Sequence, residues 1–212
     1  MRRLPGLSVL AFSIATPALL AQTPAPTPAA GQQVPKGVMP TLGRPTEGTD
    51  TVPLLDFDNY FVGKWTFEWT LPDSPLGPAG DVSGTTIVTK LGGAFYEATT
   101  EGKGPSGPFT TKEIWAYHGE NKTVARQVTD SRGFSFLQFG PVGGDLGGIY
   151  NLHFESAPFI ANGKSVRFKS SLRLLSPLNY RVAMSLSVDG GPFTSLGNPW
   201  WRKDLSYVSK KQ

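Results

Sequence analysis

The chain contains no cysteine, and only two histidines, His118 and His153. Without cysteine, no disulfide can staple an exported domain, and no lipid anchor can be attached through a thiol. Two histidines are too few for a metal site made entirely of nitrogen and sulfur ligands within one chain, which argues against a zinc hydrolase. The fold must therefore be stabilised by a hydrophobic core.

The sequence also has few catalytic motifs and only a small net charge. No Gly-x-Ser-x-Gly motif is present, and the glycines of segment 143–148 precede an expected strand instead of opening a helix, so they form no phosphate cradle. The formal net charge is +4, and it falls to +2 without Arg2 and Arg3. A charge this small, with no basic cluster, does not favour nucleic acid. We predict no catalytic residue, no metal, no cofactor and no nucleic-acid partner.

The first 53 residues divide into two segments. Arg2 and Arg3, an apolar stretch over 7–20, and the small residue Ala21 predict a signal peptide over 1–21. The apolar stretch is too short to span a bilayer, although an uncleaved anchor is the alternative, because Leu19 occupies a position where a small residue is preferred. Segment 22–53 is rich in proline and alanine and predicts a disordered linker. We expect a periplasmic or secreted protein with no stable membrane insertion after cleavage.

The folded domain is expected over 54–204, followed by a flexible tail over 205–212. Apolar residues in segment 54–61 are compatible with a short helical turn. After it the apolar period changes to two, most clearly where Trp65, Phe67, Trp69 and Leu71 alternate with polar residues. This alternation places the three rings and the leucine on one face of a strand.

Nine further segments predict strands, separated by turns rich in glycine and proline. They cover 82–90, 94–100, 109–117, 122–130, 134–139, 147–155, 166–172, 180–188 and 193–201. About ten short strands without an intervening long helix indicate an all-β fold built as an antiparallel up-and-down meander. Because closure removes exposed strand edges, we predict a barrel.

Two motifs at the ends of this domain resemble those of the calycin superfamily, which includes lipocalins and fatty-acid-binding proteins. Gly63-Lys64-Trp65 begins the first strand, and Trp200-Trp201-Arg202 ends the last. The resemblance implies a lipocalin-like barrel in which Gly63 and Trp65 lie at the closed end. It also implies that Arg202 lies across the Trp65 ring, a structural pairing that cation–π attraction would support.

The order of several further motifs resembles a bacterial family of uncharacterised, often exported, lipocalin-like proteins. These motifs are Leu91-Gly92-Gly93, Trp115-Ala116-Tyr117 and Asp130-Ser131. Resemblance to that family implies a fold but does not indicate an activity. The sequence is also similar to haem-binding nitrobindin barrels, which hold iron through a histidine near the chain end, but here no histidine follows His153.

One hairpin brings a pair of opposite charges onto an otherwise apolar face. A four-residue loop over 118–121 would place Trp115 opposite Val124 and Glu113 opposite Arg126. If it points inward, Arg126 could bind a ligand carboxylate through its planar guanidinium. The alternative is that Glu113 already satisfies it. His118 would lie in the turn, and His153 on the outer, polar face of its strand.

The expected function is to bind a small hydrophobic molecule, acidic or neutral, in the barrel interior. A barrel of ten strands is wider than the roughly eight at which side chains just fill the interior, so a cavity should remain. We expect Trp65 on its wall and the loops over 72–80 and 102–108 at its mouth. The ligand-binding candidates are Arg126, Glu113, Trp115, Trp69, Tyr180 and Met184. The alternatives are an isomerase or cyclase using Glu113, Arg126 or His153, and a barrel whose interior is filled. The oligomeric state stays open.

Overall fold

The computed structural model describes residues 51–207, so the predicted signal peptide and all but the last three residues of the predicted linker lie outside the described residues. Residues 51–53 and 205–207 belong to no helix or strand. The elements are α1 (Phe57–Phe61), β1 (Gly63–Leu71), β2 (Gly80–Gly92), β3 (Phe95–Gly104), β4 (Gly107–His118), β5 (Thr123–Asp130), β6 (Phe134–Gly144), β7 (Tyr150–Ser156), β8 (Phe159–Ala161), β9 (Lys164–Ser176), β10 (Asn179–Val188), β11 (Thr194–Gly197) and β12 (Trp200–Lys203).

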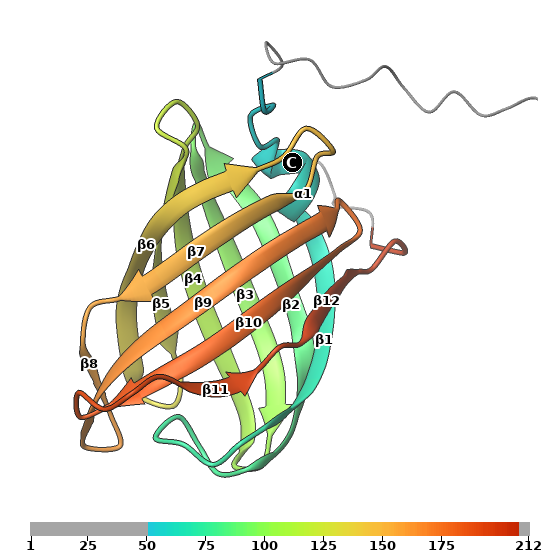
Figure 1. The fold of residues 1–212 in the computed structure, drawn as a ribbon. Coiled ribbons are helices and arrows are strands. Elements are labelled where there is room, and N and C mark those ends of the chain that lie inside the picture. The colour runs from blue at the N-terminus through green and yellow to red at the C-terminus, as the bar shows by residue number, and fades with distance from the viewer. Residues whose placement is uncertain (1–50, 208–212) are drawn as a thin grey trace, which may run out of the picture. The chain divides into compact units, whose positions relative to one another are not determined.

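Ten of the strands form a closed antiparallel ring, which confirms the predicted all-β barrel (Figure 1). Strands β1 to β7 pair in chain order, and β7 then pairs with β9 and β9 with β10. The ring closes where β12 pairs with both β10 and β1. The short strands β8 and β11 pair only with β9 and β10, respectively, outside this ring.

Two-residue alternation explains which side chains form the core. In β1, Trp65, Phe67 and Leu71 are buried, whereas Thr66 and Glu68 are exposed. The same period holds in β9, where Val166, Phe168, Ser170, Leu172 and Leu174 are buried. Because every second side chain of a strand points to the same face, each ring strand contributes one apolar face to the interior.

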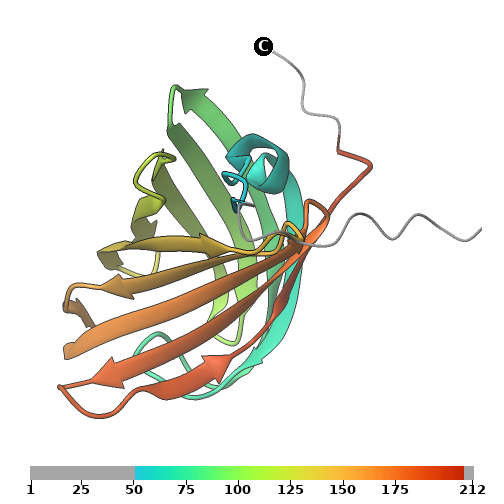
Figure 2. The same cartoon turned by 45° about the horizontal axis from the view of Figure 1, so that its top comes forward.

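Helix α1 lies across one end of the barrel (Figures 1 and 2). The Asp56 side chain caps it by accepting a hydrogen bond from the Asn59 N–H at 3.1 Å. Phe57 and Phe61 are buried, and the Trp65 indole N–H donates to the Phe61 carbonyl oxygen at 2.8 Å. The helical turn expected over 54–61 is thus present and buries aromatic rings against the core. No helix among residues 51–207 is long and apolar enough to cross a membrane.

Two local predictions were wrong, and one short strand was missed. The predicted loop over 102–108 is a tight connection at 105–106, because β3 continues to Gly104 and β4 begins at Gly107. The predicted strand over 193–201 is two strands, separated by Asn198 and Pro199, which follow Gly197 and its φ of 120°. Strand β8 was not predicted. Only three residues long, it carries too little alternation to be seen in the sequence.

Candidate functional site

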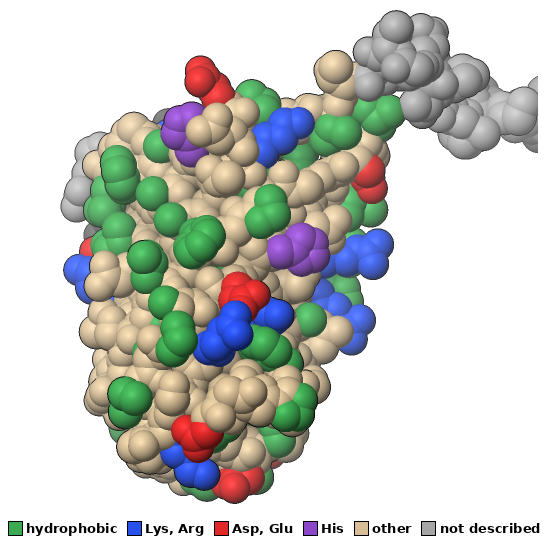
Figure 3. Space-filling view, turned by 60° about the vertical axis from the view of Figure 1, so that its left-hand side comes forward, with side chains coloured by type: hydrophobic (Ala, Val, Ile, Leu, Met, Phe, Trp, Pro, Cys, Tyr) green, Lys and Arg blue, Asp and Glu red, His purple; other side chains and the backbone are tan. Residues whose placement is uncertain are grey.

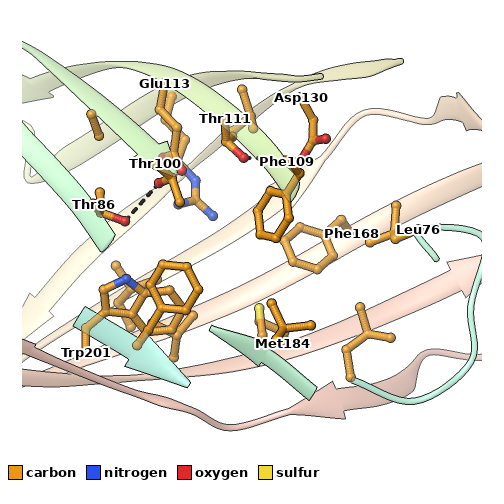
Figure 4. A pocket seen from close by; sticks show the side chains of 18 of the residues that line it. Leu76, Thr86, Thr100, Phe109, Thr111, Glu113, Asp130, Phe168, Met184 and Trp201 are labelled. Atoms are coloured by element: carbon orange, nitrogen blue, oxygen red, sulfur yellow. Dashed lines mark hydrogen bonds and ion pairs between the residues drawn. The ribbon is translucent and has the colours of Figure 1, made fainter. Parts of the chain in front are cut away.

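A cavity of about 180 Å³ lies in the barrel interior (Figure 4). All six predicted ligand-binding residues line it, namely Trp69, Glu113, Trp115, Arg126, Tyr180 and Met184. Trp65 was expected on the wall but does not line the cavity, because its ring is fully buried in the core near α1. The interior is therefore hollow in its middle, and the binding role of the lining residues stays a prediction.

One wall of the cavity is polar. Thr86, Thr100, Thr111 and Asp130 are successive cross-strand partners on β2, β3, β4 and β5, and all four line the cavity. The Thr86 and Thr100 hydroxyls lie 2.8 Å apart, and the Thr111 hydroxyl donates to Asp130 Oδ2 at 3.2 Å. Figure 4 shows this row on one side of the space, with Met184 and Trp201 on the other. The sequence analysis did not identify this row, although each member shares the parity of buried apolar residues in its strand.

Arg126 is the centre of a buried polar network. Its Nη1 lies 3.3 Å from Glu113 Oε2, its Nε donates to Gln138 Oε1 at 2.8 Å, and its Nη2 donates to Ser170 Oγ at 3.0 Å. The Arg126 and Glu113 side chains are only 11% and 16% exposed. The predicted inward ion pair is therefore present, and Glu113 neutralises Arg126 without a ligand.

Aromatic rings enclose the same guanidinium. Its central carbon lies 5.1 Å from the centre of the Trp115 ring and 4.8 Å from that of Phe154. Cations are attracted to aromatic faces at these distances. Gln138, which sequence analysis missed, is fully buried and also donates through Nε2 to the Phe168 carbonyl oxygen at 3.0 Å. The guanidinium is thus fixed by both hydrogen bonds and packing.

The predicted register of the β4–β5 hairpin was wrong by two residues. Trp115 lies opposite Arg126, and Glu113 lies opposite Val128. The turn includes Lys122, whose φ of 48° takes it out of the strand, while His118 pairs with Thr123. A shift of two residues preserves the face to which each side chain points, and therefore Glu113 and Arg126 still meet inside the barrel as diagonal neighbours.

A second ion pair lies at the end of the cavity away from α1. Arg132 Nη2 and Nε lie 2.7 Å and 2.8 Å from Oδ2 and Oδ1 of Asp130, whose side chain is only 3% exposed. Arg132 Nη1 also donates to the Leu76 carbonyl oxygen at 3.3 Å. Because Leu76 lines the cavity and belongs to the β1–β2 connection, Arg132 ties that connection to the wall. Arg132 was not predicted.

Two indole groups on the wall have unused hydrogen-bond donors. The Nε1 atoms of Trp69 and Trp115 are buried, and neither has a hydrogen-bond partner within residues 51–207. Buried N–H groups are usually paired, so each exception calls for an explanation. Both tryptophans line the cavity, but each Nε1 atom is itself enclosed by protein atoms.

The tyrosine on this wall is kept neutral. Burial raises the pKa of Tyr180 well above its usual value, and the nearby Glu113 carboxylate raises it further. Its ring packs against Trp65 at 4.7 Å and against Trp201 at 5.8 Å. Tyr180 therefore contributes an uncharged aromatic surface.

The residue that covers Trp65 is Lys203, so the prediction for Arg202 was wrong. Lys203 lies opposite Trp65 in the β1–β12 ladder, and its Nζ is 5.2 Å from the Trp65 ring centre. Arg202 is one position earlier, so its side chain points outward and reaches Glu68 at 3.9 Å. Gly63 has the expected place at the start of β1, and its φ is 133°.

Both histidines lie on the outside of the barrel (Figure 3). His118 is exposed at the β4–β5 turn, and exposed His153 pairs through Nδ1 with the Ser171 hydroxyl at 3.0 Å. Neither lines the interior cavity, so neither can hold a haem iron there. Within the described part of the chain, no three histidine, aspartate or glutamate side chains gather as a metal site would require.

No protein-family model matches the chain, and no curated protein matches it. Among solved structures, Rv2717c from M. tuberculosis is similar at 12% identity with a TM-score of 0.58, over 72% of this chain and 99% of that chain. A de novo designed fluorescence-activating β-barrel is similar at 16% identity with a TM-score of 0.41, over 71% of this chain and 100% of that chain. The first likeness shows the barrel fold alone.

Proposed function

We propose that this protein binds a small, largely apolar molecule inside the barrel. The observation that supports the proposal is the interior cavity. Most of its lining is aromatic and aliphatic, and one of its walls is polar. Apolar pockets with a few placed polar groups are the usual form of small-molecule sites. The hydroxyls of Thr86, Thr100 and Thr111 on this wall supply polar groups for such a molecule.

The size of the cavity limits the ligand. A dry cavity of roughly 150 Å³ in another protein accommodates benzene, and sites for drug-sized molecules measure roughly 300–1,000 Å³. At about 180 Å³, this cavity suits a compact molecule of about one or two rings more than a long-chain lipid. An isomerase or cyclase is the competing function, but one of its candidate residues, His153, lies outside the cavity.

Exported placement belongs to the same proposal. The predicted signal peptide would carry the chain to the periplasm or the outside, and the cysteine-free barrel needs no oxidative step to fold there. The protein would then act as an extracytoplasmic carrier or scavenger of its ligand. The calycin resemblance agrees with this role.

Titration with a neutral aromatic alcohol, naphthalene methanol, tests the binding function. We expect saturable binding that changes tryptophan emission, because Trp69 and Trp115 line the cavity. Ala98 also lines it, so Ala98→Leu should fill the space and abolish binding while the far-ultraviolet circular dichroism stays unchanged. Ala183→Leu is the matched control, since Ala183 is exposed on β10. Equal binding by wild type and Ala98→Leu would contradict an interior site.

A further inference from the structure

The charged side chains that line the cavity sum to no net charge. Two are carboxylates, Glu113 and Asp130, and each lies within 3.3 Å of a guanidinium nitrogen, of Arg126 and Arg132 respectively. Each pair sums to zero formal charge. An ion taken into a low-dielectric interior needs a partner of opposite sign that is still available, and here both cations are already paired.

Arg126 is poorly placed to receive a ligand carboxylate. Its Nε, Nη1 and Nη2 atoms each already donate to a protein acceptor, and the rings of Trp115 and Phe154 lie against the guanidinium. A bidentate grip on a carboxylate needs two parallel N–H groups on one side of the fork. An acid would have to use the N–H groups that these three bonds leave over, and its oxygens would then lie beside the Glu113 carboxylate, where like charges repel.

From these contacts, and resting on the proposed interior binding function, we infer that the cavity selects an uncharged ligand with a polar head and excludes its carboxylic acid counterpart. The head lies against the polar wall, where the hydroxyls of Thr86, Thr100 and Thr111 both donate and accept. The rest of the ligand packs against Met184, Trp201 and their apolar neighbours. Glu113 is the residue that sets this preference, because it occupies the guanidinium that an acid would need.

Two probes of nearly the same shape test the inference in the wild-type protein. Naphthalene methanol and naphthoate carry the same rings, and only naphthoate is charged at pH 7.5. We expect the alcohol to bind more tightly by at least about tenfold, in line with the cost of placing an unpaired charge beside Glu113. If naphthoate binds as tightly as the alcohol or more tightly, the inference is wrong while interior binding stands. If neither probe binds, the proposed function fails, and the inference fails with it.

A substitution reverses the preference. Glu113→Gln keeps the shape of the side chain but leaves the Arg126 charge without a carboxylate, so the ratio of naphthoate affinity to alcohol affinity should rise by about tenfold or more. Glu97→Gln is the matched control, because Glu97 pairs with Lys112 away from the cavity. Its affinities should equal those of the wild type. If Glu113→Gln folds but leaves the ratio of naphthoate affinity to alcohol affinity unchanged, Glu113 does not determine the charge preference.

Discussion

The ammonium group of Lys203 lies over the ring of Trp65 and also donates to the Asn59 carbonyl oxygen at 3.0 Å. One side chain of the last ring strand thereby contacts both the first strand and the middle of α1. Burial lowers the pKa of Lys203, as expected for a cation withdrawn from water. The contact holds the helix against the strands that close the ring.

Replacing Lys203 should therefore weaken the barrel more than replacing its neighbour. For Lys203→Ala we expect the free energy of unfolding to fall by about 1–2 kcal/mol, from the lost hydrogen bond and cation–π contact. Arg202→Ala should cost less than about 0.5 kcal/mol, because Arg202 makes only an exposed ion pair of 3.9 Å. Urea unfolding followed by tryptophan emission measures both. A larger loss for Arg202→Ala would restore the original prediction from the sequence.

The Asp130–Arg132 pair should contribute more to the free energy of unfolding than an exposed ion pair does. Arg132→Ala leaves the buried Asp130 carboxylate without its guanidinium and releases the bond to Leu76, so we expect a loss of about 2–3 kcal/mol. Lys112→Ala breaks the more exposed pair with Glu97 and should cost less than about 1 kcal/mol. Chemical denaturation of the two variants at pH 7 gives the comparison, and equal losses would show that the burial of Asp130 adds nothing.

Alkaline pH should destabilise the protein through its buried tyrosines. Burial raises the pKa of Tyr180, and that of Tyr96 is raised by burial and by its hydrogen bond to Asp58. A folded-state pKa above the unfolded value of about 10 stabilises the fold fully below that pH, and the contribution is lost as pH rises beyond it. Each such group costs up to about 1.4 kcal/mol per pH unit there.

Tyr180→Phe isolates this effect because it keeps the ring and removes the ionising hydroxyl. The fall in unfolding free energy between pH 8 and pH 11 should be smaller in this variant than in the wild type. Tyr207→Phe is the control, since Tyr207 is exposed and does not line the cavity. Urea midpoints across this pH range are the measurement. Identical alkaline losses in wild type and Tyr180→Phe would mean that Tyr180 ionises without unfolding.

Much of the site was predictable because a strand's two-residue period decides which face a side chain occupies. Trp69, Trp115 and Tyr180 share parity with apolar neighbours, and all three line the cavity. The inward direction of Glu113 and Arg126 survived an error in register, because that error was an even number of residues. Parity is local, and local alternation is visible in a single sequence.

What could not be predicted depends on turn geometry and on partners distant in the chain. Lys203 lies over Trp65 in place of Arg202 because the register of the β1–β12 ladder pairs Lys203 with Trp65, and Arg202, one residue earlier, faces outward. Ser170 reaches Arg126 across 44 positions of sequence, through strand pairings that no local pattern specifies. The tie between Arg132 and the Leu76 carbonyl likewise joins two connections that only the closed ring brings together.

Gly140 marks a place where two strands approach too closely for any side chain. A Cβ atom at this position of β6 would lie 1.5 Å from the His153 carbonyl oxygen of β7, and backbone cannot move aside as a flexible side chain can. We expect Gly140→Ala to lower the free energy of unfolding by about 3 kcal/mol, because the two strands must separate to admit the methyl group. Gly143→Ala, three residues along the same strand, meets its nearest atom at 3.8 Å and should change stability by less than about 1 kcal/mol in either direction. Thermal and urea unfolding measure the stability of both variants. Similar stabilities would contradict the prediction, because they would show that β6 and β7 can separate at Gly140 without destabilising the barrel.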